Sequence, residues 1–135
     1  MNSHIEHLNP DGLMKNPAFS QIVVTKGSGK TIYIGGQNAI NAEREIVGKG
    51  NLQLQTEQVM KNIQIALAAC DATFDDVVKL NIHIVQNQNA YEAFKVAQKF
   101  ISNSNPPAIT VLSVSGLANT DFLIEIDAIA FAGDK

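Results

Sequence analysis

Residues 52–85 have the sequence LQLQTEQVMKNIQIALAACDATFDDVVKLNIHIV, and this stretch decides the class of fold. In its first half, apolar residues recur at three- and four-residue spacing, which predicts an amphipathic helix over Leu52–Cys70. In its second half, apolar and polar residues alternate over Val77–Val85, which predicts a strand with one buried and one polar face. The predicted inner stripe of the helix consists of Val59, Ile63, Ala66, Leu67 and Cys70.

Two strands are predicted upstream of this helix, over Phe19–Thr25 and Thr31–Gly35. The turn-rich segment 26–30 (KGSGK) separates them and is typical of a hairpin. Residues 1–16 are predicted to form an irregular lead-in, since they hold turn signals and no periodic run. A further short strand is expected near Glu45–Val47.

Downstream, the pattern predicts a second helix over Asn89–Ile101 and two strands over Ala108–Ser115 and Phe122–Phe131. This order indicates a single α+β domain over residues 1–135, with a mixed β-sheet and both helices packed on one face of it. So small a domain has no third layer to cover the other face. Self-association is therefore expected.

The composition limits the function classes. The chain has 135 residues, a formal net charge of −3 and a single cysteine. An acidic chain argues against a nucleic-acid partner, and one cysteine allows no intrachain disulfide, which fits a cytoplasmic protein. No run approaches the roughly 20 apolar residues of a membrane helix, and no secretory signal is visible, so no membrane association is expected.

Four stretches resemble the RidA/YjgF (reactive intermediate deaminase) family. They are residues 16–21 (NPAFSQ), 33–37 (YIGGQ), 56–79 (TEQVMKNIQIALAACDATFDDVVK), and NPPA at 105–108 together with IEIDAIA at 124–130. The resemblance implies a chorismate-mutase-like fold, a homotrimer and ligand clefts between subunits. It also implies a small-metabolite substrate, because family deaminases hydrolyse reactive enamines and imines to 2-keto acids.

Four positions depart from the family pattern. The family arginine that follows N-P-P-A is Ile109 here, and an aliphatic side chain cannot bind a carboxylate through paired hydrogen bonds. Phe19 replaces the family tyrosine, and Val111 replaces a cysteine often found two residues after the arginine. The asparagine of the family's second helix has three possible counterparts: Ala93, Phe94 and Lys95.

Other family positions are retained or open to two interpretations. Glu125 matches the carboxylate that positions or activates water, although it can also be a plain polar-face residue. Gly35, Gly36 and Gln37 either present backbone N–H groups to a ligand or form a bulge at a strand end. Thr110 is a candidate hydrogen-bond donor to the ligand.

Three other features have simpler structural explanations. Residues 27–31 imitate the end of a phosphate-binding loop, but Val24 stands where that motif needs glycine and a strand follows instead of a helix. His83 is either a base or a solvated strand residue, and Cys70 lies on the apolar helix stripe, where burial is more common than nucleophilic reactivity. No spacing indicates a metal site, and no cofactor is expected.

Two main functions follow from these residues. The first is hydrolysis of an imine or enamine in an intersubunit cleft, although Ile109 argues against a standard 2-aminoacrylate deaminase. The alternative is a trimer that binds or senses a small metabolite without chemistry. A ribonuclease or translation inhibitor ranks below both, because the chain is acidic and lacks a histidine–lysine constellation.

Overall fold

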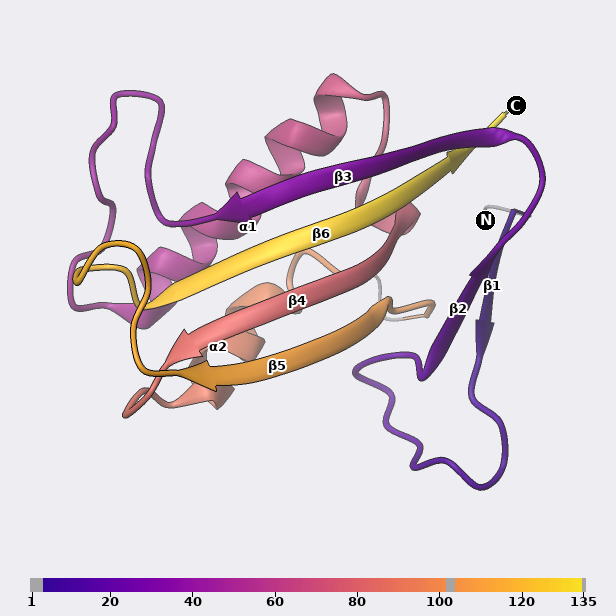
Figure 1. Ribbon diagram of the computed structural model, residues 1–135, viewed down its shortest axis with the longest axis horizontal. Helices are drawn as coiled ribbons and strands as arrows, with labels where there is room; N and C mark the ends of the chain where they lie inside the picture. Colours follow the sequence, from indigo (N-terminus) through magenta and orange to yellow (C-terminus); the bar gives the residue numbers. More distant parts are fainter. Residues whose placement is uncertain (1–3, 102–103, 135) are drawn as a thin grey trace.

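The computed structural model describes residues 4–101 and 104–134 of the chain. Its centre is a four-stranded mixed sheet in the order β3-β6-β4-β5 (Figure 1). These strands are β3 (Gly29–Gln37), β4 (Val77–Val85), β5 (Ala108–Val114) and β6 (Ile124–Gly133). The β4–β5 pair is parallel, and β6 runs antiparallel to both β3 and β4.

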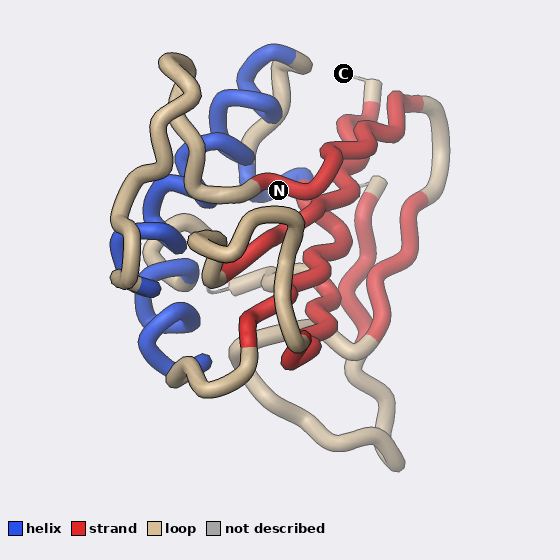
Figure 2. Tube along the Cα trace, turned by 60° about the vertical axis from the view of Figure 1, so that its left-hand side comes forward, coloured by secondary structure: helices blue, strands red, loops and turns tan. Residues whose placement is uncertain are grey.

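Two α-helices cover one face of this sheet, as Figures 1 and 2 show from two directions. The long helix α1 (Leu52–Ala69) begins at Asn51, whose side chain accepts a hydrogen bond from the Leu54 backbone N–H at 3.0 Å. The short helix α2 (Ala90–Ala97) forms the crossover between the parallel strands β4 and β5, and the one-turn helix η1 (Phe74–Asp76) precedes β4. The predicted α+β architecture is therefore confirmed. Within the described residues, no helix is long and apolar enough to span a membrane.

The hydrophobic core lies between α1 and the sheet. Alternate residues of β6 point towards the helices and are buried, whereas the residues between them lie on the opposite face. The buried residues of β6 and α1 are Ile124, Ile126, Ala128, Ala130, Val59, Met60, Ile63 and Leu67. We call the opposite side, on which no helix of the described residues packs, the uncovered face.

The fully buried Gln55 of α1 is polar but satisfied. Its amide nitrogen donates to the carbonyls of Gly48 (3.2 Å) and Asp121 (2.9 Å), and its oxygen accepts from the Leu123 N–H at 2.9 Å. These bonds connect α1 to the loops before α1 and before β6. The periodicity of the sequence did not single out this residue, because a glutamine fits a solvent-exposed position equally well.

The N-terminal region differs from the sequence prediction in two ways. The segment 1–16 is not wholly irregular, because it contains strand β1 (Ile5–Leu8), although residues 1–3 lie outside the described ranges. The predicted hairpin is wrong: β2 (Ile22–Thr25) pairs with β1, whereas β3 pairs with β6. The segment 26–28 therefore connects two separate sheets.

Two further predictions need correction. The second helix was predicted over Asn89–Ile101 but ends at Ala97, and its buried side chains are Ala93 and Ala97. The short strand expected at Glu45–Val47 is reduced to a single bridge between Ile40 and Ile46.

Candidate functional site

A cavity of about 190 Å³ lies between α2, β4, β5 and the loop that precedes β2. We call it the α2–β5 cavity. Its residues are Asn16, Ala18, Phe19, Ile82, Phe94, Ala97, Gln98, Ile101, Ile109 and Val111. Among these described residues none carries a charge, and only Asn16 and Gln98 have polar side chains. Both amides are solvent-exposed, whereas Ile82 and Ala97 are buried, so the amides lie at the mouth.

The strand register explains why two family positions face this cavity. Ile109 pairs with Leu80 and Val111 pairs with Ile82, and both partners are buried on the helix-covered face of β4. Side chains directly opposite in neighbouring strands share a face. Ile109 and Val111 therefore point towards the helices, and Thr110 between them points to the uncovered face.

The loop that forms one wall of the cavity is held at Ser20. This residue is buried, its hydroxyl donates to the Pro106 carbonyl at 2.5 Å, and its backbone N–H donates to the Pro107 carbonyl at 3.0 Å. A backbone bridge to Ala108 continues the contact into β5. Phe19 is thereby positioned next to the start of the strand that carries Ile109.

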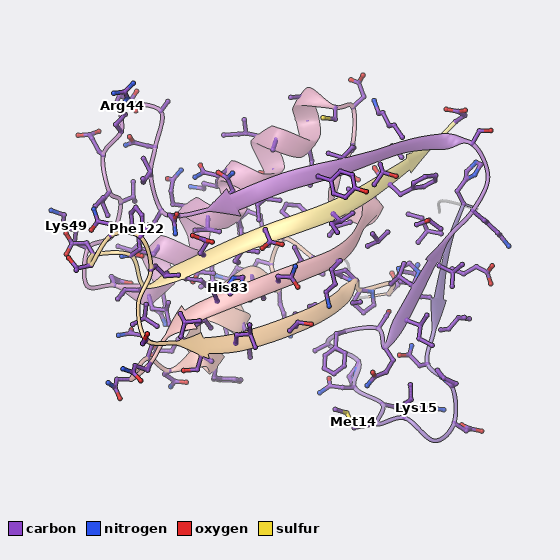
Figure 3. The ribbon with its side chains drawn as sticks, viewed as in Figure 1. Met14, Lys15, Arg44, Lys49, His83 and Phe122 are labelled. Atoms are coloured by element: carbon purple, nitrogen blue, oxygen red, sulfur yellow. The ribbon has the colours of Figure 1, made fainter. Side chains whose placement is uncertain are left out.

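The predicted carboxylate Glu125 lies on the uncovered face instead. Its backbone pairs with His83, which lies at the middle of the uncovered face in Figure 3. A Cβ atom added to Gly36 would come within 2.6 Å of Glu125 Oε2, so the carboxylate packs directly against the Gly36 backbone. The register between β3 and β6 shifts between Ile34 and Gln37, which makes Gly35–Gly36 a bulge. The bulge interpretation of this segment is confirmed.

Other polar side chains on the uncovered face pair across the strands. Asn81 donates to the Asp127 carboxylate at 2.7 Å, and Lys79 Nζ donates to Thr110 Oγ1 at 2.6 Å. His83 Nδ1 lies 3.3 Å from the Glu125 backbone oxygen. Thr110 is thus already bonded to Lys79 and faces away from the α2–β5 cavity.

The structure therefore divides the sequence-predicted site into two groups within one chain. Phe19, Ile109 and Val111 come together in the α2–β5 cavity. Glu125, Thr110 and the Gly35–Gln37 segment do not line it, since they lie at the uncovered face or at the end of β3. Within one chain, Ile109 and Glu125 therefore lie on opposite faces of the sheet.

The single arginine of the chain does not replace the missing guanidinium within one subunit. Arg44 has a positive φ of 67° at the turn of a loop in which Asn41 accepts hydrogen bonds from the Glu43 and Glu45 N–H groups. It is absent from the cavity lining. Figure 3 places Arg44 at the opposite end of the molecule from Met14 and Lys15, which belong to the loop that leads to the cavity wall.

Six lining residues were not identified as site residues from the sequence: Asn16, Ala18, Ile82, Ala97, Gln98 and Ile101. The alternation of β4 identified Ile82 as buried, but only the parallel pairing with β5 shows that it forms the cavity floor. Gln98 is exposed at the mouth, directly after the last residue of α2. Asn16 could have been identified from the sequence, because it is the first residue of the family-like stretch 16–21.

The remaining candidates do not form a site in the described ranges. The described part of the chain holds no group of three or more metal-ligating side chains. Cys70 is a half-buried free thiol at the end of α1. Residues 29–31 begin β3 rather than a helix, so the phosphate-loop interpretation lacks its structural context.

Comparison with known proteins identifies the family. The family model described as Endoribonuclease L-PSP matches residues 13–132, so the chain belongs to this family, in which RidA/YjgF proteins are grouped. A RutC family protein of Pyrococcus horikoshii is 32% identical over 104 residues, which cover 77% of this chain and 81% of that protein. A 2-iminobutanoate/2-iminopropanoate deaminase of Dermatophagoides farinae is 30% identical over 101 residues, covering 75% and 77%.

A solved structure agrees with this assignment. A protein of unknown function of the conserved Rid family from Yersinia pestis superimposes with a TM-score of 0.83 and 34% identity, over 94% of this chain and 98% of that one. The chain is therefore a RidA/YjgF-family protein with the chorismate-mutase-like α+β fold.

Proposed function

We propose that this protein is a homotrimer that binds a small metabolite in the α2–β5 cavity and is not a standard 2-aminoacrylate deaminase. The observation that carries this proposal is the uncharged lining, in which Ile109 occupies the position of the family arginine. A substrate carboxylate would lose its hydration there and gain no cationic partner. The cavity is present in the family fold, but its uncharged lining favours a ligand without a carboxylate.

The uncovered face supports the trimer. Tyr33 on the edge strand β3 is 77% exposed, and Leu112 on the opposite edge strand β5 is 50% exposed, although both lie on the regular sheet. Exposed large side chains on an otherwise ordered sheet face favour burial against another subunit. Such an assembly would also bring the uncovered face of one subunit next to a neighbour.

A thermal-shift screen of small metabolites tests the binding function. A ligand that binds only the folded state raises the melting temperature in proportion to the logarithm of its concentration over Kd. We expect a stabilising compound that is recovered unchanged after incubation. Val111→Phe, which fills the cavity mouth, should abolish the shift, whereas Ile65→Phe on the exposed side of α1 should not. No stabilisation by a broad library would count against the proposal.

Imine or enamine hydrolysis is the second candidate, because Glu125 is retained and its carboxylate rests against Gly36. In a trimer this carboxylate would direct water onto an electrophile bound by a neighbouring subunit. Glu125→Gln should then remove turnover. Gly36→Ala should lower it by displacing the carboxylate, whereas Gly35→Ala meets no atom within 4 Å and should leave it unchanged. Equal effects of the two glycine variants would argue against this role of Glu125.

A further inference from the structure

We infer that the α2–β5 cavity selects an uncharged, ring-sized molecule that carries one neutral hydrogen-bonding group, such as a carboxamide. This inference rests on the proposed function, because it names the ligand class of the same site. It reverses the charge preference that a carboxylate-binding cleft would have. Three observations carry it: the size of the cavity, the distribution of its apolar walls, and the chemistry at its mouth.

The volume limits the ligand to about one ring with a small substituent. The cavity measures about 190 Å³. An engineered apolar cavity of about 150 Å³ accepts benzene, so the present one accommodates a ring and a few further atoms.

The walls favour an apolar, unsaturated body. Phe19 and Phe94 come from two different elements and both line the cavity, together with Ile101 and Ile109. Aromatic side chains attract another ring through offset or edge-to-face contacts in addition to the burial of apolar area. Ile82 and Ala97 are the buried residues of the lining, and both are apolar.

The mouth supplies amides and no charge. The Oδ1 atom of Asn16 accepts from the Ala18 N–H at 2.9 Å, which fixes the side chain and leaves its Nδ2 as a donor. Gln98 at the end of α2 offers a second amide, which can donate and accept. Neither of the nearby cations Lys95 and Lys99 lines the cavity, and the Lys95 ammonium lies 5.5 Å from the Tyr91 ring centre. Two amides match a neutral carbonyl or carboxamide better than an anion.

A matched pair of probes tests the charge preference directly. Benzamide and benzoate have the same number of non-hydrogen atoms and differ in charge. The probes are titrated into the full-length protein, and methyl NMR signals of Ile82, Ile109 and Val111 report on the cavity, with Ile65 as a distant reference. We expect benzamide to shift the three cavity signals with a Kd at least about a hundredfold lower than that of benzoate. Isobutyramide and isobutyrate repeat the comparison with an aliphatic body.

The outcomes separate the ligand class from the binding function. Equal or tighter binding of the carboxylates at the same methyl groups would overturn the inference and leave the cavity as the binding site. No shift of the cavity signals with any of the four probes would overturn both the inference and the proposed function.

A charge-introducing variant supplies the second test. Ile109→Arg should reverse the preference towards benzoate, because a guanidinium pairs with a carboxylate. Ile65→Arg adds the same charge on an exposed surface and should change neither affinity. If Ile109→Arg does not fold, Val111→Lys introduces a cation at a position that is already partly exposed. A folded variant of either kind that keeps the preference for benzamide would contradict the inference.

Discussion

Ile109 and Glu125 lie on opposite faces of the same sheet. Ile109 pairs with the buried Leu80 and lines the α2–β5 cavity, whereas Glu125 pairs with His83 on the uncovered face. The position that should hold a substrate carboxylate and the carboxylate that should direct water therefore cannot meet within one subunit. Any chemistry that uses both must be built at a contact between subunits, so assembly is the first property to test.

Tyr33→Asp should dissociate the assembly. Tyr33 is 77% exposed on the uncovered face, in the edge strand β3, and a charge there would be buried without a partner in a subunit contact. Tyr91→Asp is the matched control, because Tyr91 is 65% exposed on α2, on the other side of the sheet. Sedimentation equilibrium should give a trimer for the wild type and Tyr91→Asp, and a monomer for Tyr33→Asp. A monomeric wild type would refute the predicted assembly.

Gln55→Leu should lower the free energy of unfolding by at least about 2 kcal/mol, since it removes the partners of three backbone groups. Those groups are the carbonyls of Gly48 and Asp121 and the N–H of Leu123. Gln53→Leu on the exposed side of the same helix should change it by less than about 0.5 kcal/mol. Urea unfolding measures the free energy of unfolding of both variants. Similar values for the two variants would show that the buried amide contributes little.

Ser20→Ala tests the anchor of the cavity wall. Loss of the hydroxyl leaves the Pro106 carbonyl without its partner, so we expect a decrease of about 1–3 kcal/mol in the free energy of unfolding. Ligand affinity should fall as well, because Phe19 is adjacent in the same loop. Ser28→Ala, in the exposed turn before β3, is the control and should change neither property. An unchanged affinity for Ser20→Ala would show that the loop is held by its other contacts.

His7 predicts a pH dependence of stability. Burial lowers the pKa of this β1 side chain from its ordinary value of 6.5, so the fold favours the neutral ring. Above pH 6.5 both states are neutral and the full stability is present. As the pH falls from 6.5 towards the lowered pKa, the unfolded chain binds the proton first and stability is lost.

Urea unfolding at about pH 8 and about pH 5.5 measures this dependence. His7→Gln should show a smaller decrease between the two pH values than the wild type. The other histidines are present in both proteins and cancel in the comparison. An identical decrease in the two proteins would exclude a contribution from His7.

The sequence predicted the elements whose periodicity is local. The helix predicted over Leu52–Cys70 is α1 (Leu52–Ala69), and β4 has the predicted bounds Val77–Val85. The apolar stripe of α1 and the alternating apolar residues of β4 are the residues that pack in the core, so both patterns are visible in the local sequence. The partners of strands were harder to predict, because β2 pairs with β1 and β3 pairs with the distant β6. A turn-rich linker has the same composition whether or not the strands on either side pair.

The candidate site was predicted in part for the same reason. Family-like stretches identified Phe19, Ile109 and Val111, which the fold brings into one cavity. They did not show that Thr110 and Glu125 face away from it, since facing depends on strand register. Gln98 and Ile101 line the cavity as well, but the sequence placed both within the second helix. In the structure α2 ends at Ala97, before both residues.

The rate of 2-iminopropanoate hydrolysis by the wild-type protein tests the central claim most directly. The Dermatophagoides farinae deaminase, which is 30% identical, provides the positive control under the same conditions. Without a cation in the α2–β5 cavity, we expect the protein to leave the rate at that of buffer alone. Acceleration by the wild type that disappears in Glu125→Ala would contradict the account, because the carboxylate-bearing imine would then be held and hydrolysed despite Ile109.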